Sequence, residues 1–454
     1  MPMEKHPAPR YTVAFYTLGC RVNQYETRAV EEAFVAKGFL IGSFDEKCDV
    51  YVINTCTVTA ESDRKSRQII RRARKVGGKD ALVLAMGCMV AVSPEEAARI
   101  HGLDLAIGNR DKTALADAAL TLLLKKGKAV TDESMTALFD EDTSVRMQVT
   151  GSDRARAFLK IADGCDNHCS YCIIPKARGE VRSKSENDIC DEVRGLVKAG
   201  YKEVVLTGIE TAAYGRDTGS DLITLVERVS ALGDDAPVRL RLGSLEPTVI
   251  KADSAARLAA CAPVCPHFHL SLQSGSDRVL AAMRRKYNTR MFFTVTERLR
   301  AAFPDVTLTT DIIVGFPGET EEMFLETMAF VRRVGFLYVH IFPYSDRTGT
   351  EASLRTDKLD EAVKKDRAAR LKAVMLEVRQ AQLERFIGTV RPVLVEKVEN
   401  GTAIGHTDNF IETHIDVQAH PEITENCILP VRLLELDPSL SHINAILTKG
   451  EDVH

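Results

Sequence analysis

The chain of 454 residues has no tryptophan, few aromatic residues (6%) and no long apolar run. Its longest apolar stretch, Ala81 to Val92, is too short to cross a bilayer, which takes about 20 residues. The first ten residues are polar and contain proline, so they do not resemble a secretory signal. We therefore expect a cytoplasmic protein with no membrane partner, whereas the lack of tryptophan excludes no class of fold.

Net charge is also low, at −4 at pH 7. A balance this close to zero excludes a general affinity for polyanions, so any contact with nucleic acid has to come from local patches. The glycine-bearing segment from Asp311 to Glu319 lacks the lysine of a phosphate-binding loop, which argues against nucleoside triphosphate chemistry. With 45% hydrophobic residues, the chain is long enough for roughly two to four globular domains.

Cysteine, by contrast, is plentiful, with 11 residues. In a reducing compartment this number favours metal ligation or buried thiols over a disulfide framework. Cys165, Cys169 and Cys172 stand in one tight loop, at spacings of four and then three. The alternating apolar run from Arg156 to Ala162 predicts a strand just before this loop. The thiols therefore belong at the carboxyl end of a strand, where α/β sheets build their sites.

Three thiols this close can hold one metal centre. A structural zinc ion normally takes four protein ligands, and His168 would have to fold back sharply to become the fourth. An iron–sulfur cube held by three thiolates leaves one iron open to an outside ligand, which suits catalysis. We favour the cube, with zinc and three unliganded buried cysteines as the alternatives.

The first part of the chain predicts a second site of the same kind. Three strand–helix units follow one another, which is typical of a doubly wound parallel sheet. The predicted strands are followed by Cys20, Cys56 and Cys88. Because the carboxyl ends of parallel strands lie side by side, these three thiols should converge. The alternative is three small buried cysteines that bind nothing.

Between the second and third strands lies a strongly basic segment. On a helix, Arg64, Arg67, Arg71 and Arg74 fall on one stripe. Such a stripe could follow the phosphates of an RNA, and an ordinary solvated helix face explains it equally well.

The second half predicts an incomplete α/β barrel. Its expected strands are Arg156 to Ala162, Val204 to Thr207, Val238 to Leu242, Phe268 to Leu272, Leu308 to Val314 and Leu337 to Phe342, with helical patterns between them. A long helix from Leu359 to Phe386 precedes short strands joined by hairpins, which predict a small antiparallel β-barrel. The expected divisions are an N-terminal domain over 10–126, a linker over 127–152, a barrel domain over 153–385 and a C-terminal domain over 386–450.

The C-x3-C-x2-C loop resembles the cluster loop of radical S-adenosylmethionine enzymes. Together with Thr17 to Thr27, Asn54 to Thr59 and Asp63 to Arg67, it resembles the methylthiotransferase family along nearly the whole chain. These segments look like the branch that acts on N6-threonylcarbamoyladenosine at position 37 of tRNA, next to the anticodon. The branches that act on isopentenyladenosine in tRNA or on a ribosomal-protein aspartate remain the alternatives.

The resemblance implies two [4Fe-4S] clusters. Cys165, Cys169 and Cys172 would hold the radical cluster, and an auxiliary cluster held by Cys20, Cys56 and Cys88 would carry the sulfur to be inserted. One S-adenosylmethionine would methylate that sulfur and a second would supply the radical that activates C2 of the adenine. Contacts to the cofactor or substrate are implied for Tyr171, Gly208, Glu210, Glu246, Gln273, Asp311 and Gly315.

The implied partners are tRNA, a reducing electron donor and a sulfur donor. The C-terminal piece resembles a TRAM domain, which is an RNA-binding β-barrel. Two positions depart from the family pattern, Lys176 and the segment Thr211 to Ala213, and both bear on substrate contacts. A function of another class also stays open, namely an RNA-binding protein whose clusters are structural or sense redox state.

Overall fold

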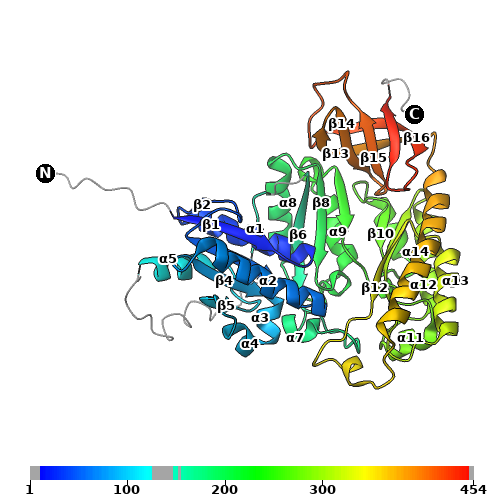
Figure 1. The fold of residues 1–454 in the computed structure, drawn as a ribbon. Coiled ribbons are helices and arrows are strands. Elements are labelled where there is room, and N and C mark those ends of the chain that lie inside the picture. The colour runs from blue at the N-terminus through cyan, green and yellow to red at the C-terminus, as the bar shows by residue number, and fades with distance from the viewer. Residues whose placement is uncertain (1–10, 125–146, 152–154, 449–454) are drawn as a thin grey trace. The chain divides into compact units, whose positions relative to one another are not determined.

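The computed structural model describes residues 11–124, 147–151 and 155–448 (Figure 1). The chain divides into two compact units. The first comprises Met1–Val149, Asp163–Asp166 and Cys172–Glu180, and the second comprises Thr150–Ala162, Asn167–Tyr171 and Val181–His454. The predicted linker over 127–152 lies largely outside the described residues. No helix within the described ranges is long and apolar enough to span a membrane.

The first unit is built on a five-stranded parallel sheet in the order β2-β1-β3-β4-β5. Its strands are β1 (Thr12–Thr17), β2 (Leu40–Ile41), β3 (Val50–Thr55), β4 (Leu82–Gly87) and β5 (Leu105–Ile107). Its helices are α1 (Arg21–Ala36), α2 (Ala60–Gly77), α3 (Cys88–Val92), α4 (Pro94–Ala98), α5 (Leu115–Leu124) and α7 (Ile174–Arg178).

Apolar cores lie on both faces of this sheet. Phe34 of α1 and Leu115 of α5 pack on one face, and Ile70 of α2 packs on the other. The central strand β3 is buried along its whole length, as a strand covered on both faces should be. The predicted doubly wound sheet is confirmed, and β2 and β5 extend it at its two edges.

The second unit contains an open barrel of parallel strands. Its strands are β6 (Arg156–Asp163), β8 (Glu203–Gly208), β9 (Arg239–Leu242), β10 (His267–His269), β11 (Thr307–Val314) and β12 (Tyr338–Pro343), with β7 (Arg182–Ser183) beside β6. Isolated bridges from Leu240 to Val264 and from Leu245 to Leu270 connect the β6-β8-β9 part to the β10-β11-β12 part. This arrangement confirms the predicted six-stranded partial barrel.

Six helices of the described residues cover this barrel, and four of them begin at capping side chains. The six are α8 (Glu186–Lys198), α9 (Leu222–Ser230), α10 (Ser254–Ala260), α11 (Asp277–Ala282), α12 (Thr289–Ala302) and α13 (Glu321–Val334). The side chains of Ser185, Asp221, Asn288 and Thr320 each accept a hydrogen bond from a backbone N–H in the first turn of α8, α9, α12 and α13. Such caps satisfy amides that a helix start leaves unpaired, and they fix where each helix begins.

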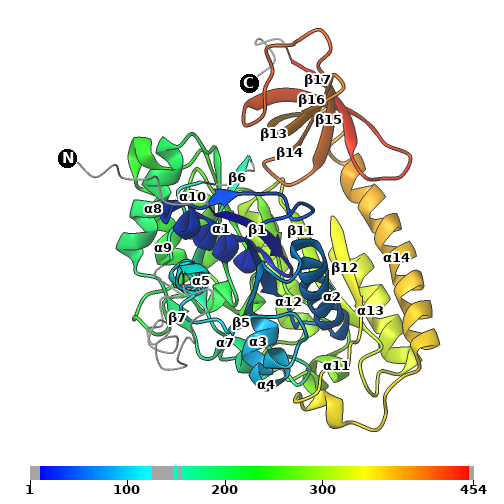
Figure 2. The same ribbon diagram turned by 60° about the vertical axis from the view of Figure 1, so that its left-hand side comes forward.

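A long helix leads from the open barrel to the C-terminal strands (Figure 2). This helix, α14 (Glu361–Glu384), buries Leu371, Val374 and Met375 against α13 and β12. The strands that follow are β13 (Val390–Glu399), β14 (Thr402–Thr407), β15 (Glu412–Asp416), β16 (Ile428–Leu436) and β17 (Ile443–Leu447). They close into a barrel in the order β13-β14-β15-β17-β16, which confirms the predicted small barrel. One pairing in it, β15 with β17, is parallel.

Phe410, in the loop between β14 and β15, joins the C-terminal barrel to the starts of the open-barrel strands. Its ring stacks on His267 with centroids 4.5 Å apart, and the guanidinium carbons of Arg156 and Arg241 lie 5.1 and 4.9 Å from its centroid. Arg241 in turn donates to the buried Glu203. Burial alone would raise the pKa of Glu203, but Arg241, Arg156 and Arg239 lower it to about 2. An ionised carboxylate thus anchors the cations that hold the ring.

Replacing Phe410 should loosen this junction. The φ of Phe410 is 71°, where the backbone of alanine is strained just as that of phenylalanine is. Phe410→Ala therefore isolates the loss of the ring. We expect a loss of about 2 kcal/mol in the free energy of unfolding, measured by chemical denaturation. The control is Phe342→Ala, which removes a half-exposed ring of β12. Equal losses in the two variants would contradict a specific role for Phe410.

Candidate functional site

In the first unit, the three predicted cysteines follow neighbouring strands. Cys20 follows β1, Cys56 follows β3, and Cys88 is the first residue after β4. The strand register pairs Thr17 with Asn54 and Thr55 with Gly87, which places the three strand ends in line. Cys88 is close enough to Cys20 and Cys56 for its charge to raise the pKa of both thiols. The structure therefore brings the three cysteines to one edge of the sheet, as the sequence predicts.

Two of these cysteines follow glycines that no other residue could replace without strain. Gly19 and Gly87 have φ values of 101° and 105°. A Cβ on Gly19 would lie 3.1 Å from the sulfur of Cys56, and a Cβ on Gly87 would lie 2.5 Å from Oδ1 of Asn54. The backbone before each cysteine thus runs directly against the neighbouring strand end, which a side chain would prevent.

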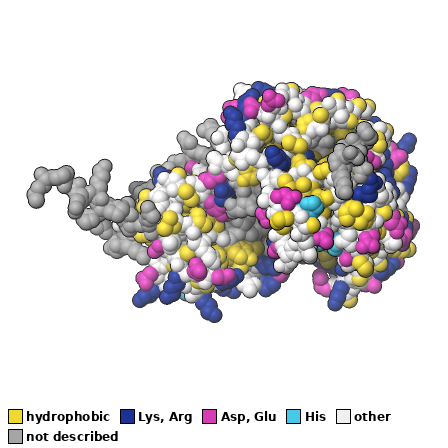
Figure 3. Space-filling view, turned by 90° about the horizontal axis from the view of Figure 1, so that it is seen from above, with side chains coloured by type: hydrophobic (Ala, Val, Ile, Leu, Met, Phe, Trp, Pro, Cys, Tyr) yellow, Lys and Arg dark blue, Asp and Glu magenta, His cyan; other side chains and the backbone are white. Residues whose placement is uncertain are grey.

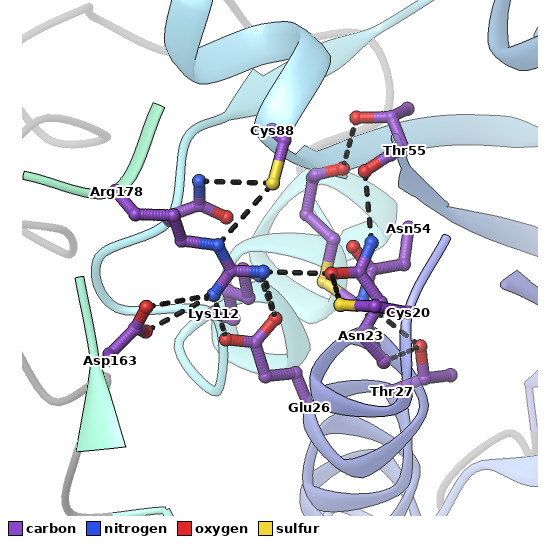
Figure 4. A network of polar contacts seen from close by, with 12 residues as sticks. Cys20, Asn23, Glu26, Thr27, Asn54, Thr55, Cys88, Lys112, Asp163 and Arg178 are labelled. Atoms are coloured by element: carbon purple, nitrogen blue, oxygen red, sulfur yellow. Dashed lines mark hydrogen bonds and ion pairs between the residues drawn. The ribbon is translucent and has the colours of Figure 1, made fainter. Parts of the chain in front are cut away.

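Cys88 receives hydrogen bonds from two side-chain nitrogens. Nδ2 of Asn109 lies 3.6 Å from its sulfur, and Nε of Arg178 lies 3.3 Å from the same atom (Figure 4). The thiol of Cys20, in contrast, donates to the side-chain oxygen Oδ1 of Asn23 at 3.6 Å. Donors directed at a sulfur suit a thiolate ligand, because they stabilise its negative charge.

The thiols of Cys20 and Cys56 resist ionisation in the protein alone, because their pKa values are raised. Cys20 is exposed as a residue, yet the protein atoms around its thiol raise the pKa, and Arg178 opposes that rise. Burial likewise raises the pKa of the Cys56 thiol. A bound metal would have to displace these protons, as metal binding by cysteine generally does.

The loop with the other three cysteines is shaped by Gly164. This residue has a φ of 79°, and a Cβ on it would lie 1.8 Å from the carbonyl oxygen of Glu180, so only glycine fits. The backbone N–H of Cys165 donates to the carbonyl of Gly179 at 3.0 Å. Cys165, Cys169 and Cys172 are all partly exposed, so an outside molecule can reach this loop.

The middle of the same loop carries a polar cluster of the second unit. Nδ2 of Asn167 lies 3.1 Å from a carboxylate oxygen of Glu210 and 3.3 Å from one of Glu246. Arg285 donates to the sulfur of Cys169 at 3.0 Å and pairs with Glu246 at 3.4 Å. The structure thus unites two of the predicted rim carboxylates beside the loop.

In the sequence, Arg285 belongs to the basic run from Arg284 to Lys286, which could be a cationic cluster near the rim or a solvated helix end. Its side chain is only 6% exposed, which excludes the solvated helix end. Asn167 was visible only as a polar residue of the cysteine loop, and its link to both carboxylates could not be read from spacing. Neither residue stood among the predicted site residues.

Glu210 has an unusual affinity for protons. Burial, followed by the nearby Glu246, raises its pKa to about 7. Asn167 bridges the two carboxylates and so keeps the charge of Glu246 close to Glu210, where it opposes ionisation of Glu210.

Asp311 lies in the carboxyl half of β11 and Gly208 ends β8, whereas Gln273 and Gly315 lie in the segments that follow β10 and β11. Gln273 has a φ of 70°, and its N–H donates to the carbonyl of Asp311. The Asp311 carboxylate pairs with His269 at 3.2 Å, and His340 from the next strand offers a nitrogen within 4.8 Å of both.

The ring of Tyr171 contacts Phe316 edge to face, next to Gly315. Gly208 ends β8, where the carbonyl of Ala162 leaves little room for a side chain.

The two departures from the family pattern also have defined places. Lys176 lies on α7, and Thr211 to Ala213 form a buried single turn directly after Glu210. The chain turns back directly after Glu210, because the backbone N–H of Ala213 donates to the carbonyl of Glu210.

The basic stripe of α2 is largely engaged in contacts within the protein. Arg64 pairs with Glu61 and Arg67 with Glu96, while Arg74 binds Asp104 and the carbonyls of neighbouring loops. Arg67 and Arg71 line a hollow of about 380 Å³ together with Glu96, Arg99, Ile100 and His101. On the face seen in Figure 3, basic and acidic side chains are interspersed. RNA binding by the stripe therefore stays a prediction.

Glu210 should make stability depend on pH. Because its pKa in the folded protein lies above the ordinary 4.5, the folded state holds an extra proton between those values, and the free energy of unfolding falls as pH rises from about 4.5 to 7. Glu210→Gln stays neutral and should remove that part of the decline in thermal stability measured from pH 5 to 8. The surface variant Glu227→Gln should retain it, since the pKa of Glu227 is lowered by Arg257. An unchanged decline in Glu210→Gln would contradict the assignment.

Comparisons with known proteins agree with this geometry. The sequence profile of the radical SAM superfamily matches residues 159–331, and that of the uncharacterized protein family UPF0004 matches residues 12–108. Among solved structures, the radical S-adenosylmethionine methyltransferase TsrM from Kitasatospora setae has a TM-score of 0.56 at 15% identity. The match covers 76% of this chain and 77% of that chain. A likeness at this identity shows the fold alone.

Relatives with full-length similarity are more informative. Proteins named threonylcarbamoyladenosine tRNA methylthiotransferase MtaB are 39% identical over 416 residues in Bacillus subtilis and 39% identical over 401 residues in Aquifex aeolicus. These matches cover 88% of this chain and 89% and 95% of the relatives. A tRNA-2-methylthio-N(6)-dimethylallyladenosine synthase from Methylacidiphilum infernorum is 32% identical over 433 residues, covering 93% of this chain and 92% of the relative. The chain therefore belongs to the radical SAM methylthiotransferase family.

Proposed function

We propose that this protein adds a methylthio group to C2 of N6-threonylcarbamoyladenosine at position 37 of tRNA, next to the anticodon. The observation that carries the proposal is the 39% identity, along 88% of the chain, to two enzymes named for threonylcarbamoyladenosine in tRNA. The two sets of three cysteines supply the chemistry that such a transfer needs.

The family uses [4Fe-4S] clusters and S-adenosylmethionine, and we propose which residues hold them. Cys165, Cys169 and Cys172 would hold the radical cluster, and Cys20, Cys56 and Cys88 the auxiliary cluster. The fit is supported by donors aimed at sulfur in each set, Arg285 at Cys169 and Arg178 at Cys88. When bound, the first cluster supplies the electron that splits S-adenosylmethionine, and the second supplies the sulfur that is transferred.

The protein's own residues would bind and orient the cofactor. Glu210 and Glu246 lie beside the radical loop and offer carboxylate oxygens to the donors of S-adenosylmethionine. Gln273, Asp311 and Gly315 follow on neighbouring strands, where Gly315 leaves its backbone accessible for a close approach. Tyr171 and Gly208 complete this proposed set at the cofactor side.

We assign the tRNA to two surfaces. In addition to the proposed domains over 10–126 and 153–385, we propose that the C-terminal barrel, predicted over 386–450, is an RNA-binding TRAM-like domain. The hollow with Arg67, Arg71 and Arg99 offers cations for a phosphate. A reducing electron donor and a sulfur donor are implied by the reaction, and the cytoplasm, where tRNA is modified, is the proposed location.

A second candidate substrate is isopentenyladenosine in tRNA. It is favoured by the 32% identity to an enzyme named for dimethylallyladenosine, over 93% of this chain. Because this identity is lower than that to the MtaB enzymes, we place this substrate second.

The two substrates are separated by one assay. The reconstituted protein, a reductant, S-adenosylmethionine and sulfide are incubated with tRNA carrying either N6-threonylcarbamoyladenosine or isopentenyladenosine, and the digested nucleosides are analysed by mass spectrometry. We expect the methylthio product from the first tRNA at a rate at least about tenfold higher, which corresponds to about 1.4 kcal/mol of discrimination. Product from the second tRNA alone would overturn the proposal.

Cysteine variants serve as internal controls in the same assay. Cys169→Ala should abolish cleavage of S-adenosylmethionine to 5′-deoxyadenosine. Cys56→Ala should leave that cleavage and stop sulfur insertion. Methylthiolation by either variant would contradict the role proposed for that cysteine.

A further inference from the structure

We propose that Arg178 is a positioning residue for the auxiliary cluster. By donating a hydrogen bond to the sulfur of Cys88, Arg178 raises the reduction potential of that cluster and slows its loss of iron. This inference rests on the proposed function, because it takes Cys20, Cys56 and Cys88 as cluster ligands.

The first argument is the fixed direction of the Arg178 side chain, which has no exposure to solvent. One terminal nitrogen, Nη1, donates to Glu26 at 2.5 Å and to the two oxygens of Asp163 at 3.2 and 3.1 Å. The other, Nη2, donates to Asn23 at 2.7 Å and to Glu26 at 3.1 Å. Because the guanidinium is planar and held at both ends, its Nε can point in one direction only, and that direction is the sulfur of Cys88 at 3.3 Å (Figure 4).

The second argument is the charge balance of the surroundings. Glu26, Asp163, Arg178 and Lys112 are all fully buried, and Lys112 pairs with Glu26. Two carboxylates and two cations therefore neutralise one another without any help from cysteine. The contact of Nε with Cys88 is an addition to this ion-pair network, which would be complete as a purely structural element without it.

The third argument is that Cys88 differs from Cys20 in its hydrogen bonds. Cys88 has Asn109 as a second side-chain donor, at 3.6 Å, whereas the thiol of Cys20 donates to Oδ1 of Asn23, also at 3.6 Å. A donor to a thiolate withdraws electron density from the iron it binds, which favours the reduced cluster. Cys56 also has hydrogen-bonding neighbours, in the backbone of Val58 and Thr57 and the side chain of Ser62. Cys88 differs because one of its two donors is a buried, charged guanidinium, and this makes Cys88 the ligand through which Arg178 tunes the cluster.

The fourth argument is the place of Arg178 in the chain. It ends α7, six positions after Cys172, and α7 packs on α3, which begins at Cys88. Asn109 holds the same helix by donating to the carbonyl of Ala177 at 2.8 Å. The segment that follows a proposed ligand of the radical cluster thus supplies the donor to a proposed ligand of the auxiliary cluster.

The test observes the auxiliary cluster alone, in the full-length chain with Cys165, Cys169 and Cys172 changed to alanine. After anaerobic reconstitution, the midpoint potential is measured by a redox titration followed by electron paramagnetic resonance, and iron loss is measured with a chelator. Arg178→Lys keeps the charge and loses the fixed Nε donor. We expect a shift to lower potential and iron loss at least about tenfold faster.

Lys112→Met is the matched control, because it removes a buried cation of the same network without touching Cys88. It should lower thermal stability and, because only a buried charge and not a donor to Cys88 is lost, lower the potential by less than Arg178→Lys does. If Lys112→Met lowers the potential as much as Arg178→Lys does, or if neither variant changes it, Arg178 has only a structural role and the inference fails.

Two further outcomes are distinguished by additional measurements: an Arg178→Lys variant that does not fold, and a parent chain that binds no cluster. If Arg178→Lys does not fold, Asn109→Ala removes the other donor to Cys88 and leaves the ion pairs intact; it should lower the potential, and an unchanged potential would overturn the tuning of Cys88. If the parent chain, with Arg178 in place, binds no iron–sulfur cluster at all, the proposed auxiliary site fails, and with it the proposed function.

Discussion

The convergence of parallel strand ends is the constraint on which the first unit depends. Cysteines more than 30 positions apart meet because β1, β3 and β4 run side by side and each stops at a cysteine. Gly19 and Gly87 make this possible, since any Cβ there would collide with the neighbouring strand end. The hydrophobic cores on both faces of the sheet hold the strand register, and the register in turn fixes where the sulfurs lie.

A second theme is the buried arginine beside a thiol. Arg178 contacts Cys88 and Arg285 contacts Cys169, and each guanidinium is also held by carboxylates. A buried cation alone is costly, so the carboxylates are needed to keep it in place. A guanidinium held in this way would stabilise a thiolate at each of the two cysteines. Two unrelated parts of the chain thus solve the same electrostatic problem in the same way.

Much of the fold followed from local sequence patterns. Strand–helix alternation predicted the parallel sheets of both units. The pattern of short strands joined by hairpins predicted the C-terminal barrel, whose first hairpin turns at Asn400 and Gly401. The short edge strands β2 and β5 were missed, because two or three residues carry no clear period. The cysteine sets were predictable, since each one follows a strand or stands in a single loop.

The polar partners of the cysteines were beyond sequence reasoning. Arg178 looked like one more basic residue after the cysteine loop, and its link to Glu26 spans 152 positions. Asn109 and Asn167 carry no motif, and their roles depend on contacts that only the folded chain creates. The basic stripe of α2 is the opposite case. Its helical pattern is clear in the sequence, but three of its arginines form ion pairs with Glu61, Glu96 and Asp104 in the folded protein.

The central claim is that the chain holds two separate three-thiolate clusters, and iron counting tests it most directly. The wild type and two triple alanine variants, one for each cysteine set, are reconstituted anaerobically with iron and sulfide and examined by Mössbauer spectroscopy. The account predicts about eight irons in the wild type and about four in each variant, as two cubes require. Four irons in the wild type, or zinc in place of iron, would contradict it.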